Sequence, residues 1–150
     1  MGEFDSIEKV LEFAIAREIE ANQFYMELAG QMANPTMRQV FEEFAKEELG
    51  HKAKLEAMKT DRTMEPAKKV INLKIADYIV DGESGPNMEY QDALILAMQK
   101  EKASFRLYTD LAAEVENEDQ QKIFLALAQE EAKHKLYFET EYDDVILREN

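Results

Sequence analysis

The sequence predicts an all-α protein, a four-helix bundle of two antiparallel helix pairs with one long crossover connection between the second and third helices. Only 5 glycines and 3 prolines interrupt 150 residues, of which 45% are hydrophobic and 33% charged. This composition suits long amphipathic helices. In four segments apolar residues recur at alternating steps of three and four, as on the buried face of a bundled helix. The chain also contains an internal repeat.

The repeat relates the two halves at a constant offset of 83 residues, the difference between His134 and His51. Its strongest part matches FEEFAKEELGHKAKL at 41–55 with FLALAQEEAKHKLYF at 124–138. Each copy contains two helical segments joined by a short turn, so each is predicted to form an antiparallel helix pair.

The first helix is expected over 5–32, with Asp5 as its N-cap and Pro35 marking its end. Thr36 followed by Gln39 resembles a capping box and predicts the start of the second helix. Asn87 is the expected cap of the third helix, and a turn at 117–119 precedes the fourth. We expect one domain over 1–150, with repeat one at about 5–59, a crossover at 60–87, repeat two at about 88–142 and a tail at 143–150.

Composition restricts the function. The formal net charge of −14 disfavours nucleic acid and anionic membranes as partners. The chain has no cysteine, which excludes disulfides and thiolate-bound metal within it. Neither a targeting segment nor an apolar run long enough to span a membrane is visible, so a soluble cytoplasmic protein is expected.

The line of periodic apolar residues along each predicted helix is called its seam. Six polar residues occupy central positions in these seams: Glu18, Glu48, His51, Glu101, Glu131 and His134. A carboxylate removed from water must be neutralised or bound to a cation. Two divalent cations would balance four carboxylates, because neutral imidazoles add no charge. The pattern therefore predicts a two-metal site, and the alternative is that both Glu-x-x-His pairs lie on the surface of a duplicated bundle.

The spacing supports metal binding because residues three apart are neighbours on a helix. Glu48 can therefore share a metal with His51, and Glu131 with His134. Oxygen-rich ligation with one imidazole per metal favours two iron ions, with manganese as the second candidate and zinc less suited.

This arrangement of glutamates and histidines resembles that of the ferritin-like di-iron carboxylate proteins and, within them, of the rubrerythrin family. The resemblance covers nearly the whole chain and implies a ferritin-like fold. It identifies Glu18 and Glu101 with the ligands from helices one and three, and the two Glu-x-x-His motifs with the remaining four. It also implies that Tyr25 and Tyr108 donate hydrogen bonds to ligand carboxylates.

Two features depart from the family pattern. Rubrerythrins proper have a rubredoxin domain whose iron is bound by four cysteines, and these 150 residues contain no cysteine. An external redox partner protein is therefore expected. The family's additional carboxylate on helix three is also missing, because Ser104 lies one turn after Glu101, which predicts weaker peroxidase activity.

The predicted function is a di-iron oxidoreductase that reacts with O₂ or hydrogen peroxide in detoxification. One alternative is a ferroxidase or iron-handling protein. Another is a non-catalytic helical binding module stabilised by metal. A homo-oligomer, a dimer, is expected, in which Val145, Ile146 and Leu147 meet a partner subunit.

Overall fold

A computed structural model describes residues 7–60, 75–80 and 89–149. Its elements are α1 (Ile7–Gln31), α2 (Pro35–Thr60), the 3₁₀ helix η1 (Ile75–Tyr78), α3 (Tyr90–Glu114) and α4 (Glu118–Glu149). No strand occurs among these described residues, so the predicted all-α class is confirmed. The chain divides into two compact units, Met1–Ile75 and Ala76–Asn150, which are called hairpin one and hairpin two.

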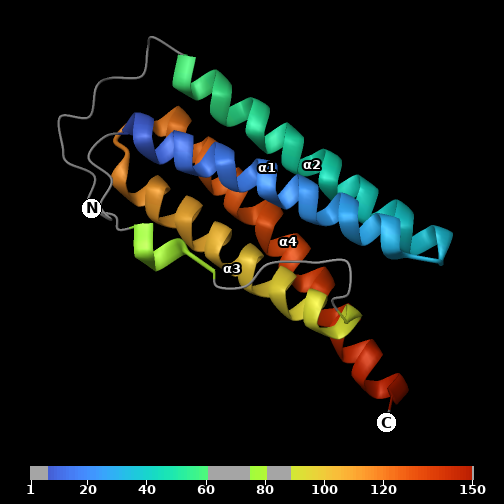
Figure 1. Cartoon of the computed structure of the whole chain (residues 1–150). Helices are drawn as coiled ribbons and strands as arrows, with labels where there is room; N and C mark the ends of the chain where they lie inside the picture. Colours follow the sequence, from blue (N-terminus) through green and yellow to red (C-terminus); the bar gives the residue numbers. More distant parts are fainter. Residues whose placement is uncertain (1–6, 61–74, 81–88, 150) are drawn as a thin grey trace. The chain divides into compact units, whose positions relative to one another are not determined.

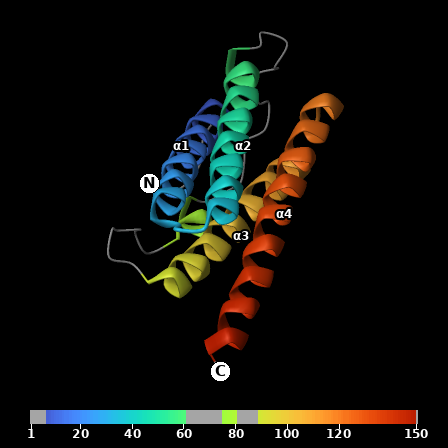
Figure 2. The ribbon, with the colours of Figure 1, turned by 90° about the vertical axis from the view of Figure 1, so that its right-hand side faces the viewer.

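In hairpin one, α1 and α2 lie side by side and antiparallel (Figures 1 and 2). The predicted capping box at Thr36 and Gln39 is wrong, because α2 already begins at Pro35. Asn34 is the cap: its Oδ1 accepts hydrogen bonds from the backbone N–H groups of Thr36 at 2.8 Å and Met37 at 3.4 Å. Pro35 fits the first helical position because it has no N–H to leave unbonded there.

Hairpin two pairs α3 with α4 in the same antiparallel manner (Figure 2). Asn117 caps α4, since its Oδ1 accepts a hydrogen bond from the Gln120 N–H at 3.0 Å. Asn117 is the repeat equivalent of Asn34. The predicted cap of the third helix is corrected: α3 begins at Tyr90, with Glu89 at the N-cap position making no side-chain capping bond.

The predicted tail at 143–150 continues α4 as far as Glu149. The Tyr90 hydroxyl and Glu141 Oε1 are hydrogen-bonded at 3.1 Å, which fixes the start of α3 beside Glu141. Residues 142–149 therefore continue α4 past the first residue of α3, as Figure 1 also shows.

The short helix η1 is attached to α3 through Tyr78, which is 1% exposed. Its hydroxyl donates a hydrogen bond to Asp110 Oδ2 at 2.7 Å, and the Arg106 guanidinium lies 5.8 Å from its ring centre. Burial and the neighbouring carboxylate of Asp110 raise the pKa of Tyr78. Most of the predicted crossover at 60–87, and the predicted cap Asp5, lie outside the described residues.

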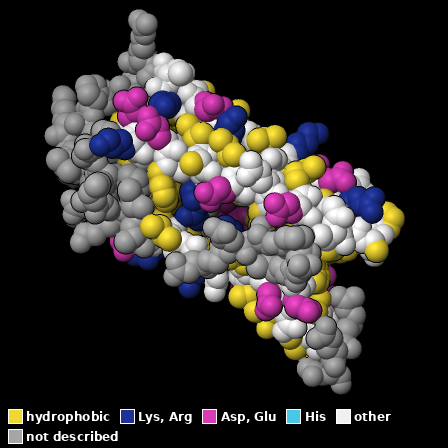
Figure 3. All heavy atoms as spheres, viewed as in Figure 1, with side chains coloured by type: hydrophobic (Ala, Val, Ile, Leu, Met, Phe, Trp, Pro, Cys, Tyr) yellow, Lys and Arg dark blue, Asp and Glu magenta, His cyan; other side chains and the backbone are white. Residues whose placement is uncertain are grey.

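The predicted seams form the cores. Large side chains at the equivalent positions Phe41 and Phe124, and Leu11 and Leu94, have no exposed surface. Charged side chains of both signs are interspersed with apolar ones on the surface in Figure 3. None of the helices within the described ranges is both long and apolar enough to cross a membrane.

Candidate metal centre

Hairpin one brings together three of the predicted site residues. Glu18 comes from α1, and Glu48 and His51 come from α2; they are 1%, 1% and 4% exposed. His51 Nδ1 lies 3.6 Å from Glu18 Oε2 and 3.6 Å from Glu48 Oε1. The imidazole therefore faces one carboxylate on its own helix and another on the neighbouring helix.

Hairpin two repeats this arrangement. Glu101 comes from α3, and Glu131 and His134 come from α4; they are 1%, 1% and 2% exposed. His134 Nδ1 lies 3.6 Å from Glu101 Oε1, the same separation as between His51 and Glu18. In each hairpin the three residues offer ligand atoms that lie within 4.8 Å of one another.

A separation of 3.6 Å is too long for a hydrogen bond. It does suit two ligand atoms that share a metal ion, since atoms each about 2.1 Å from one ion lie roughly 3–4 Å apart. The donor set fits a hard or borderline cation. Each triad carries two carboxylates and one imidazole in a buried position, so a divalent cation would balance its charge. The residues present therefore fit iron or manganese.

Small side chains adjoin the triads. Ala14 and Ala97, one turn before Glu18 and Glu101, are fully buried. Ala21 and Ser104, on the following turn, are half-buried. Side chains as small as alanine and serine leave room beside the carboxylates.

Asn22 is a structural residue that the sequence analysis missed. Its Nδ2 donates a hydrogen bond to the backbone carbonyl of Ala45 at 2.8 Å. Asn22 lies four residues after Glu18, and Ala45 three residues before Glu48, so this bond joins α1 to α2 about one turn from both glutamates. The internal repeat does not indicate this hydrogen bond, because the position equivalent to Asn22 in hairpin two is Phe105, which is 39% exposed.

Tyr25 and Tyr108 are each 1% exposed. The Tyr25 ring packs edge-on against Phe44 with centroids 6.0 Å apart, and the Tyr108 ring stacks on Phe124 at 6.4 Å. Buried tyrosine hydroxyls usually find a hydrogen-bond partner. The bond to a ligand carboxylate that the family resemblance implies stays a prediction.

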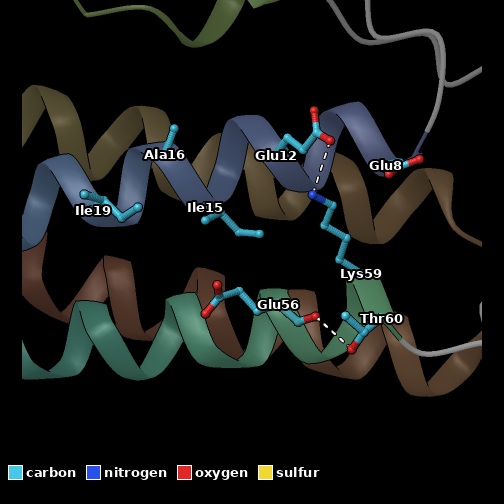
Figure 4. A pocket seen from close by; sticks show the side chains of 8 residues that line it. All are labelled: Glu8, Glu12, Ile15, Ala16, Ile19, Glu56, Lys59 and Thr60. Carbon is cyan, nitrogen blue, oxygen red and sulfur yellow. Dashed lines mark hydrogen bonds and ion pairs between the residues drawn. The ribbon is translucent and has the colours of Figure 1, made fainter.

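A separate hollow lies on hairpin one, where α1 begins and α2 ends (Figure 4). It has a volume of about 570 Å³, and its lining includes Ile15 and Ile19 of α1 and Glu56 of α2. Lys59 of α2 forms an ion pair with Glu12 of α1 at 3.2 Å beside it. None of the six predicted metal ligands lines this hollow.

Comparisons with solved structures find chains of similar fold. A structure from Thermotoga maritima, described as a ferritin-like diiron-carboxylate protein, matches with a TM-score of 0.81 at 21% identity, covering 97% of this chain and 99% of the other. A hypothetical protein from Pyrococcus furiosus matches with a TM-score of 0.68 at 26% identity, covering 91% and 87%. Comparison with curated proteins finds no match.

The fold is thus the ferritin-like four-helix fold. The family model of rubrerythrin matches residues 9–142, nearly the whole chain. A rubredoxin iron centre needs four cysteines, so none lies within these 150 residues. The chain belongs to the rubrerythrin family.

Proposed function

We propose that the two triads hold two iron ions, which act as a pair in reducing hydrogen peroxide or O₂. One observation carries the proposal: each hairpin presents a buried Glu-Glu-His set with ligand atoms within 4.8 Å of one another, at equivalent positions of the repeat. Manganese remains the second candidate metal.

The protein's residues have defined parts in this chemistry. The four carboxylates neutralise the two cations, and the neutral imidazoles of His51 and His134 complete the donor sets without adding charge. The apolar cores around them limit access of water. Tyr25 and Tyr108 are the proposed proton donors, each through its hydroxyl hydrogen.

When bound, two ferrous ions supply the two electrons that hydrogen peroxide needs. The overall reaction is H₂O₂ plus two electrons and two protons giving two water molecules. The chain lacks cysteine, so an external redox protein is proposed to return the electrons for the next turnover.

The test is anaerobic loading with Fe(II), followed by measured additions of peroxide. We expect about two iron ions per chain and about one peroxide consumed per iron pair. Glu131→Gln should reduce iron occupancy and peroxide consumption. Glu130→Gln is the matched control, because Glu130 is next to Glu131 but pairs with Lys133 at 3.4 Å on the surface; it should behave as the unmodified protein.

Two other results would replace the proposal. Two iron ions without reaction with peroxide or O₂ would indicate a metal that only stabilises the fold. O₂ consumption only in the presence of excess Fe(II), with release of Fe(III), would indicate an iron-handling protein.

A further inference from the structure

Gly50 lies in the interior of α2, between Glu48 and His51. Among residues other than proline, glycine stabilises a helix least, because its backbone loses the most conformational freedom on folding. Glycine is favoured where a neighbouring group leaves no room for a side chain, or where the backbone is left-handed at the end of a helix. A glycine in the middle of α2 therefore needs a reason of one of these kinds.

Neither reason applies to Gly50. A Cβ atom added at this position would meet no atom of the described residues within 4 Å, apart from the backbone of its own helical turn. The backbone at Gly50 is not left-handed, and α2 continues beyond it to Thr60. An alanine would fit here, so the distinct contribution of this glycine is local freedom of the backbone.

The repeat shows that this freedom belongs to hairpin one. The position equivalent to Gly50 on α4 is Lys133, whose Nζ lies 3.4 Å from Glu130 Oε1. This ion pair spans Glu131, and Gly50 has no side chain that could form its counterpart on α2. Exposed ion pairs contribute little to stability, so the larger difference between the two helices is the lower helix propensity of glycine.

The freedom lies where it affects the candidate metal centre. His51 Nδ1 lies 3.6 Å from Glu48 Oε1 on its own helix and 3.6 Å from Glu18 Oε2 on α1. Because Gly50 lies between Glu48 and His51 in the chain, its backbone dihedral angles help to set the orientation of His51 relative to both carboxylates. A change at Gly50 therefore alters the separations within this triad.

We propose that Gly50 is a positioning residue that makes the α2 turn carrying Glu48 and His51 easier to open than the equivalent turn of α4. A metal ion in hairpin one is then released faster than one in hairpin two, although the two ligand sets are alike. The part that concerns metal rests on the proposed function. The difference between the two helices does not, so it is tested on protein without metal.

Hydrogen–deuterium exchange on the metal-free protein, followed by mass spectrometry, tests the helices. After correction for intrinsic rates, the amides of 47–54 should exchange faster than those of 130–137. Gly50→Ala should slow exchange in 47–54 by about two- to fivefold, which is the helix penalty of glycine expressed as an equilibrium constant, and should leave 130–137 unchanged. Unchanged exchange in 47–54, or equal slowing in both segments, would overturn the proposal.

Gly30→Ala is the matched control for this experiment. Gly30 is the other glycine within the described helices, and a Cβ atom there also meets no described atom within 4 Å. It lies near the end of α1, which closes at Gln31, and is remote in sequence from Glu18. Gly30→Ala should leave exchange in 47–54 unchanged; slowing equal to that of Gly50→Ala would show that any stabilised helix has this effect, and would overturn the proposal.

Release of iron tests the consequence for metal. Protein loaded anaerobically with Fe(II) is mixed with excess ferrozine, a chelator that becomes coloured when it binds Fe(II). We expect two phases of equal amplitude, the faster slowed about two- to fivefold by Gly50→Ala. The reciprocal change Lys133→Gly should accelerate the slower phase, whereas Lys133→Ala, which removes the ion pair but keeps a good helix former, should change it less than twofold.

Two results of the release experiment would overturn the proposed asymmetry. One is a single phase for both ions. The other is a Gly50→Ala protein in which the slower phase, rather than the faster, has changed. A protein that binds no iron would instead refute the proposed function, and the exchange rates of the metal-free protein would still decide whether Gly50 loosens α2.

Discussion

The two hairpins are alike inside and different outside. Both place Glu, Glu and His at equivalent buried positions, and both begin their second helix with an asparagine cap. Their outer parts diverge: α4 exposes Leu125, Leu136 and Leu147, and the Asn22 bond to Ala45 occurs in hairpin one. The difference teaches that the two hairpins share the buried positions that the proposed metal-ligand role would require, whereas their outer faces have diverged.

The largest expected effect tests whether the two cores are equally important. Phe41→Ala and Phe124→Ala each remove a ring with no exposed surface. Each should lower the free energy of unfolding by about 3–5 kcal/mol, because truncation loses buried apolar area and leaves a cavity. Urea denaturation would measure both. Met26→Ala, at an exposed position, should cost less than about 0.5 kcal/mol; a large cost for only one phenylalanine would contradict equivalence of the cores.

The second comparison concerns the triads. Glu18→Gln and Glu101→Gln should each weaken iron binding at least about 100-fold, the upper range seen when residues that only support metal ligands are lost. The metal-free proteins should be as stable as the unmodified protein or more so, because a buried charge has been removed. Chelator competition, and thermal unfolding with and without EDTA, would measure the two effects.

Glu20→Gln, on the exposed surface of α1, is the control and should change neither quantity. If Glu18→Gln weakened binding while Glu101→Gln had no effect, the proposed equivalence of the triads would be wrong.

A third prediction addresses Tyr78 of hairpin two. Tyr78→Phe should cost about 1–3 kcal/mol, since it leaves Asp110 without its hydrogen-bond donor. The folded state raises the pKa of Tyr78, mainly through burial. The folded state therefore holds this proton more tightly than the unfolded state, and the contribution to stability falls as pH rises above about 10.

Unfolding free energies of metal-free protein between pH 8 and pH 11 would check this effect. The unmodified protein should lose stability more steeply with rising pH than Tyr78→Phe does. Parallel pH profiles for the two proteins would show that Tyr78 does not titrate as proposed.

The smallest expected effect concerns the asparagine caps at the starts of α2 and α4. Asn34→Ala and Asn117→Ala should each cost about 0.5–2 kcal/mol, because each removes the acceptor for N–H groups at a helix start. Replacement by glycine should cost less. Thermal unfolding should show similar decreases in Tm for the two alanine variants. An unchanged Tm for Asn117→Ala would mean that the α4 cap does not stabilise the fold.

Much of the fold could be predicted from local sequence. The seam positions Leu11, Phe41, Leu94 and Phe124 are all buried, because periodic apolar residues define the inner face of a helix wherever it packs. Helix starts were less predictable. At the start of α2, Thr36 resembles a cap in sequence, but Asn34 occupies the cap position and Pro35 the first helical position. At the start of α3, Glu89 occupies the N-cap position and makes no side-chain capping bond.

The sequence by itself determined the all-α class, the repeat and the six buried polar residues, because periodicity and charge balance depend only on residue type and spacing. Tertiary structure decided contacts between residues far apart in the chain. Examples are the 3.6 Å approach of His51 to Glu18, the Asn22 bond to Ala45, and the Tyr78 bond to Asp110 across 32 residues. These contacts depend on the rotamers and axial offset of packed helices, which no local pattern specifies.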